Sequence, residues 1–189
     1  MIYSIPATPP WLLKRPRINY TIHQSSKDNA SLAIYGNKFF EVCDHYKDFC
    51  RLYTDGSRMG NQVAAAVVRG TVTKTTRLPN NASIFRAELY AISLALAVIR
   101  RRKEKNFIIF SDSMSSLEAS GFKLEIDIVQ NIIKDYTHLA NSGKIICWIP
   151  SHVNIHGNDR ADTAAKSALS LPITNKKLPA RELIPCVSV

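Results

Sequence analysis

The period of the apolar residues changes once along this chain, and that change limits the folds that it can adopt. Residues 51–57, 63–69 and 71–77 alternate in polarity or are rich in β-branched side chains, which predicts three strands. The short gaps between them predict an antiparallel meander. Residues 83–102 then place their apolar side chains on one broad helical face, with Ser83 as the predicted N-cap.

The patterned region continues as an alternation of strands and helices. Two short apolar runs, residues 107–111 and 145–150, predict buried strands. Helices are predicted over residues 113–119, 124–141 and 159–169. This order predicts an α/β fold in which a five-stranded mixed sheet carries helices on both faces.

The two ends of the chain are weakly patterned. Residues 1–50 contain four prolines before position 17 and predict a weakly structured N-terminal connector, with a short helix over residues 39–49. Residues 51–171 form the predicted domain, and residues 172–189 form a C-terminal tail. One domain with tails suits a chain of 189 residues.

Composition narrows the class of protein. Hydrophobic residues make up 46% of the chain and charged residues 21%, so a packed core can form. The net charge of +10 favours a polyanionic partner, although a basic surface alone leaves that open. The four cysteines lack the paired spacing of a zinc site, and Cys147 is expected to be a buried free thiol. No signal peptide or bilayer-spanning stretch is predicted, so we expect an intracellular protein without a membrane partner, in either the nucleus or the cytoplasm.

Two carboxylates lie where an acid is unfavourable. Asp55 interrupts a strand pattern, although the Gly56 that follows could simply mark the end of that strand. Glu88 shares a helical stripe with Ile84 and Ile92. A carboxylate buried among apolar residues costs several kcal/mol unless it is paired or binds a cation.

Two more carboxylates have both structural and functional interpretations. Asp112 ends the strand predicted over residues 107–111, where it could cap the next helix or join the ligands that collect at strand ends. Asp162 lies in the last predicted helix, where it could merely favour the helix dipole.

Taken together, the four acids suggest metal chemistry. Clustered carboxylates repel one another and take up protons, whereas Mg²⁺ prefers oxygen ligands and removes the repulsion. Two such ions about 3.5–4 Å apart can activate water and neutralise the leaving oxygen of a phosphodiester. The basic charge and the acids are therefore consistent with a metal-dependent nuclease.

Ordered motifs around these acids strongly resemble the type 1 ribonuclease H family. The acids are separated by 33, 24 and 50 residues, a spacing that looks right for that family, and the resemblance covers about residues 51–171. The motifs are Tyr53-Thr54-Asp55-Gly56-Ser57, Ala87-Glu88-Leu89-Tyr90-Ala91-Ile92, Phe110-Ser111-Asp112-Ser113, Ser151-His152 and Gly157-Asn158-Asp159-Arg160-Ala161-Asp162.

The resemblance implies roles for individual residues. The four acids would hold two Mg²⁺ ions, with Mn²⁺ as an alternative, and the chain would hydrolyse the RNA strand of RNA–DNA hybrids to a 5′-phosphate and a 3′-hydroxyl. His152 would assist proton transfer and product departure, while Asn158, Gly56 and Ser57 would contact the substrate. RNA would be selected through its 2′-hydroxyls. Asn154 stands at a position that is often glycine in the family, which puts the conformation of the histidine loop in doubt.

The amino acids of these motifs are most similar to those in the ribonuclease H domain of non-LTR retrotransposon polyproteins. That resemblance implies an upstream reverse transcriptase, to which residues 1–50 would be the connector. Two alternatives to an active hybrid ribonuclease stay open: a catalytically inactive, retroelement-derived nucleic-acid-binding module, and a DNA-directed nuclease of similar fold such as a transposase. The transposase-like group usually carries three acids rather than four.

Overall fold

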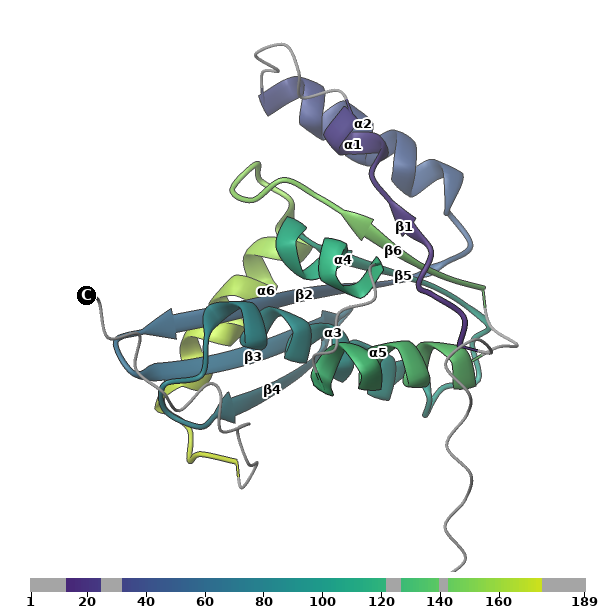
Figure 1. Ribbon diagram of the computed structural model, residues 1–189. Coiled ribbons are helices and arrows are strands. Elements are labelled where there is room, and N and C mark those ends of the chain that lie inside the picture. The colour runs from purple at the N-terminus through teal and green to yellow at the C-terminus, as the bar shows by residue number, and fades with distance from the viewer. Residues whose placement is uncertain (1–12, 25–31, 122–126, 140–142, 175–189) are drawn as a thin grey trace, which may run out of the picture.

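The core of the fold is a six-stranded mixed sheet, whose strands are labelled in Figure 1. The computed structural model describes residues 13–24, 32–121, 127–139 and 143–174. The antiparallel half of the sheet joins β2 to β3 and β3 to β4, and the parallel half joins β2 to β5, β5 to β6 and β6 to β1. In spatial order the strands are β1 (Ile18–Asn19), β6 (Gly143–Trp148), β5 (Asn106–Ser111), β2 (Cys50–Met59), β3 (Gln62–Arg69) and β4 (Val72–Leu78).

Helices cover both faces of this sheet. On one face lie α3, α4 and α5, and α6 packs on the other face against β2 and β3 (Figure 1). The short α1 and the longer α2 precede the sheet's central strands in the chain. The bounds are α1 (Thr21–Gln24), α2 (Leu32–His45), α3 (Ile84–Ile99), α4 (Met114–Gly121), α5 (Asp127–His138) and α6 (His156–Ser167), with a 3₁₀ turn at Ala168–Ser170.

The central strand β5 divides the core into two layers, because successive side chains of a strand point to opposite faces. Phe107 and Ile109 are buried in the layer beneath α3 and α5. Ile108 and Phe110 are buried in the opposite layer, together with Val42 of α2. A strand that is covered on both faces is continuously apolar, which is the pattern that its sequence shows.

The predicted α/β fold with helices on both faces is confirmed, with one strand more than expected. The additional strand is β1, which pairs in parallel with β6 through Ile18 and Asn19 and comes from the segment predicted to be weakly structured. The helix expected over residues 39–49 is longer and begins earlier, as α2. The predicted cap of α3 is also confirmed, since the Ser83 hydroxyl accepts a hydrogen bond from the Arg86 backbone N–H at 3.1 Å.

Other boundaries moved by a few residues. The last helix, α6, begins at His156 rather than at Asp159, so Asp162 lies in its second turn. Cys147 is a buried free thiol, as predicted. Most of the predicted tail, residues 175–189, and the proposed connector residues 1–12 lie outside the described residues. Within the described residues, every helix is too short or too polar to span a bilayer.

Candidate active site

Three of the four predicted acids converge at one point of the sheet. Asp55 lies on β2, Glu88 in the second turn of α3, and Asp112 directly after β5. One carboxylate oxygen from each lies within 4.8 Å of the others. Asp55 is 6% exposed and Glu88 is 9% exposed, so the cluster is largely removed from water.

Gly56 explains how Glu88 comes so close to the sheet. A Cβ atom at this position would lie 2.8 Å from the backbone nitrogen of Glu88 and 2.9 Å from the Cβ of Ala87. Only glycine therefore lets the backbone of α3 approach β2 this closely. The sequence suggested that Gly56 contacts the substrate; in the structure its missing side chain also permits the acids to meet.

Burial and mutual repulsion change the protonation of the cluster. Burial is the larger effect and the neighbouring acids add to it, raising the pKa of Asp55 to about 8 and that of Glu88 to about 9. Burial also raises the pKa of Asp112, while the Asn158 hydrogen bond opposes that rise. In the absence of a cation the cluster therefore holds protons at neutral pH.

One atom of the cluster lacks a hydrogen-bond partner. Oε2 of Glu88 is buried and has no partner among the described residues. A buried polar atom without a partner is unfavourable, because its interaction with water is lost and not replaced. Three close carboxylates and one unsatisfied oxygen suit a hard divalent cation, which prefers oxygen ligands and would remove the repulsion. The residues present therefore fit the predicted metal.

Asp162, the fourth predicted acid, lies beside the cluster but outside the 4.8 Å group. Its charge contributes to the raised pKa of both Asp55 and Asp112. Its carboxylate accepts a hydrogen bond from the Lys166 ammonium at 2.7 Å, one turn further along α6. The Asp162 carboxylate is therefore paired with the Lys166 ammonium, where a metal ion could otherwise bind.

Two side chains hold Asp112 in position. The Asn158 amide, which is 4% exposed, donates to Oδ2 of Asp112 at 3.1 Å. The indole N–H of Trp148 donates to the backbone carbonyl of Asp112 at 3.2 Å. Asn158 is also the residue predicted to contact the substrate; its nitrogen faces the cluster, and its Oδ1 is buried without a partner among the described residues.

The remaining predicted residues are His152 and Ser57. His152 is exposed in the loop after β6, and its charge lowers the pKa of Asp112. The backbone φ angles of His152 (56°) and Asn154 (59°) both lie in the left-handed region, which glycine favours. Asn154 therefore adopts the conformation that would suit the glycine often found at this position. Ser57 is 8% exposed on β2.

Two interactions at the candidate site were not predicted from the sequence. The Asp162–Lys166 pair has the four-residue spacing at which opposite charges meet on a helix, so that spacing could have revealed it. Trp148 carried no comparable signal, because its contact with the backbone of Asp112 joins residues 36 positions apart.

Comparison with known proteins agrees with this geometry. The ribonuclease H family model matches residues 47–170, a range that contains the three clustered acids, Asp162 and His152. No curated protein sequence matches the chain. The family match covers well over half of the 189 residues. The chain therefore belongs to the ribonuclease H family.

Proposed function

We propose that this domain is an active endoribonuclease that hydrolyses the RNA strand of RNA–DNA hybrids with two divalent metal ions. The observation that carries the proposal is the convergence of Asp55, Glu88 and Asp112, with the unsatisfied Oε2 of Glu88 among them. Three buried carboxylates that repel one another are unfavourable unless a cation binds among them.

Four acids would bind the metal in this mechanism. Asp55, Glu88 and Asp112 would hold the metal, and Asp162 would be a fourth ligand if its carboxylate were released from Lys166. Bound Mg²⁺, or Mn²⁺, supplies Lewis-acid polarisation of the phosphate and lowers the pKa of the attacking water.

Other side chains serve the substrate and the proton. Water attacks phosphorus and the bond to the 3′-oxygen breaks, which leaves a 5′-phosphate and a 3′-hydroxyl. His152, exposed beside Asp112, delivers a proton to that 3′-oxygen and assists product departure. Asn158 keeps Asp112 oriented. Gly56 and Ser57 border the cluster on β2 and contact the hybrid.

We also propose that the domain acts inside the cell as part of a non-LTR retroelement polyprotein, downstream of a reverse transcriptase. The amino acids of the motifs around the four acids support this origin, because they resemble those of such polyproteins. A polymerase that makes DNA on an RNA template generates the hybrid that such a domain degrades.

The test is cleavage of a labelled RNA–DNA hybrid beside duplex RNA and duplex DNA, in Mg²⁺ and in EDTA. We expect Mg²⁺-dependent cutting of the hybrid's RNA strand alone. Asp55→Asn should abolish it with the fold unchanged, whereas Asp159→Asn, an exposed acid on α6 outside the cluster, should cut normally. A folded wild-type protein that binds hybrid and leaves it intact would identify an inactive binding module instead, and cutting of duplex DNA would favour the transposase-like alternative.

A further inference from the structure

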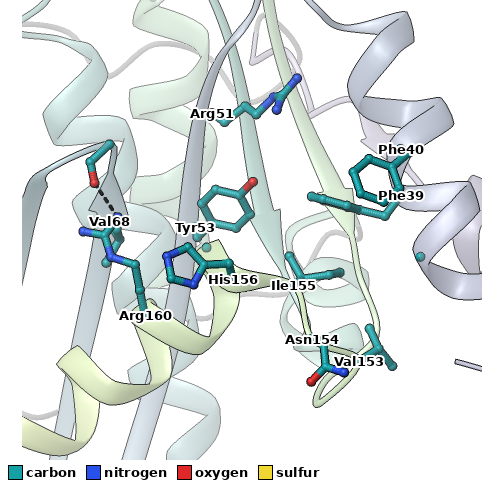
Figure 2. Close-up of a pocket in the computed structure, with 13 residues that line it drawn as sticks. Phe39, Phe40, Arg51, Tyr53, Val68, Val153, Asn154, Ile155, His156 and Arg160 are labelled. Atoms are coloured by element: carbon teal, nitrogen blue, oxygen red, sulfur yellow. Dashed lines mark hydrogen bonds between the residues drawn. The ribbon is translucent and has the colours of Figure 1, made fainter. Parts of the chain in front are cut away.

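A cavity lies between α2 and the N-terminal end of α6, and it is separate from the acid cluster. Its volume is about 450 Å³, within the range of small-molecule sites. Figure 2 shows side chains of α2 on one side and of β2, the loop before α6 and α6 itself on the other. None of the predicted catalytic residues lines it.

Aromatic rings form much of this pocket. Phe39 and Phe40 come from α2, and Tyr53 comes from β2 (Figure 2). The buried Phe110 fixes two of them, since its ring centroid lies 5.1 Å from Tyr53 in a stacked arrangement and 5.3 Å from Phe39. Phe40 is different, because it is 69% exposed, more than any other large apolar side chain that the structure describes. An aromatic ring left in water at the edge of a pocket suggests a surface that a partner covers.

The pocket is lined by basic side chains. Arg51, His156 and Arg160 line it, and none of the described aspartates or glutamates does. Arg51 donates one hydrogen bond to the carbonyl of Cys43, and Arg160 donates one to the carbonyl of Gly70. Neither guanidinium forms an ion pair within the described part of the chain. Each is thus anchored through a neutral carbonyl and keeps its positive charge for an anion.

We propose that this pocket binds an unpaired nucleotide, as an accessory site for the single-stranded extension of a nucleic-acid substrate. Aromatic rings stack on the flat face of any base, and arginine pairs with phosphate. The exposed ring of Phe40 and the basic lining, in which the described residues include no acid, offer both contacts within one cavity. A peptide would fill the apolar part but would leave the two arginines without a partner. The proposal rests on the proposed function only for the source of the strand.

One loop carries both His152 and part of the pocket lining. Residues 153–155 line the pocket. The same loop carries His152, whose charge acts on Asp112. The pocket therefore adjoins the loop segment whose His152 acts on Asp112.

The test measures binding of a fluorescent single-stranded oligothymidylate of about ten nucleotides by anisotropy in EDTA. Phe40→Ala should weaken binding at least about fivefold, because base–aromatic stacking contributes that much per base. Ile34→Ala is the matched control, an exposed apolar residue of α2 that does not line the pocket, and should bind as wild type does. Arg51→Gln should reduce the slope of log affinity against log salt by about 0.7, the effect of one phosphate contact on single strands.

Equal affinities of wild type, Phe40→Ala and Ile34→Ala would overturn the proposal. So would failure of the wild-type protein to bind the oligonucleotide, which would leave a protein segment as the occupant. Phe40 is too exposed for its loss to unfold the domain, and circular dichroism of each variant checks this. Because the assay uses no metal and an uncleaved strand, its result is independent of whether the protein cuts hybrids.

Discussion

Replacing Glu88 with glutamine should stabilise the metal-free protein while it weakens metal binding. In the folded protein the pKa of Glu88 is about 9, against 4.5 for an unperturbed glutamate. Between those values the folded state binds more protons than the unfolded state, so stability falls as pH rises. The loss is absent below pH 4.5, grows through neutral pH and is complete above about pH 9.

The size of the effect follows from this shift. Each pH unit above 4.5 costs about 1.4 kcal/mol until the folded pKa is reached, so Glu88 costs about 3 kcal/mol at pH 7 and less than about 1 kcal/mol at pH 5. Glutamine carries no titrating charge, and its amide N–H groups would face the carboxylates of Asp55 and Asp112. For a chain of this length, about 3 kcal/mol corresponds to a rise in Tm of roughly 6–12 °C.

The assay is thermal unfolding in EDTA, followed by far-ultraviolet circular dichroism at pH 5 and pH 7. The Tm difference between Glu88→Gln and wild type should be small at pH 5 and large at pH 7. Glu118→Gln removes an exposed glutamate of α4 and should match wild type at both pH values. Adding Mg²⁺ should raise the Tm of wild type and leave Glu88→Gln unchanged. A Glu88→Gln protein no more stable than wild type at pH 7 would refute the assignment of a buried, electrostatically unfavourable cluster.

Four further substitutions probe the cluster and the fold. Lys166→Met should tighten Mg²⁺ binding by a few-fold at most, measured by calorimetry, because an exposed ion pair no longer competes for the fourth acid. Gly157→Ala should lower the free energy of unfolding in urea by about 1–3 kcal/mol, since its Cβ would lie 2.3 Å from the ring of Tyr53. Gly36→Ala on α2 has nothing within 4 Å and should instead add about 0.5–1 kcal/mol. Arg77→Met should cost about 2–4 kcal/mol in the same measurement, because the buried guanidinium donates to three backbone carbonyls; an unchanged midpoint would show that those carbonyls find other donors.

The parts of the fold that the sequence predicted are those with a clear period. The alternation of β2, the continuous apolar run of β3 and the apolar stripe of α3 match the residues that each element buries, so their patterns are visible in the sequence. The two-residue β1 is too short to show a period, and its pairing with β6 depends on a partner far along the chain. Prolines in the first 16 residues also hid the regular structure that follows them.

The candidate site was predictable in its residues but not in its construction. Asp55, Glu88 and Asp112 were found because acids in strand patterns or helical stripes are unfavourable and because they match family motifs. Their distances, and the displacement of Asp162 toward Lys166, depend on how α3 and α6 pack on the sheet. The nucleotide pocket was not predicted, since it depends on how α2, which carries none of the family motifs, packs beside the start of α6.

Calorimetric titration of the wild-type protein with Mg²⁺ tests whether the carboxylate cluster is a divalent-cation site. The titration is run at pH 7 in two buffers of different protonation enthalpy. Because Asp55 and Glu88 hold protons at pH 7, we predict saturable binding with proton release, seen as a buffer-dependent heat, that disappears in Glu88→Gln. Absence of saturable binding, or binding that Glu88→Gln leaves unchanged, would contradict the account.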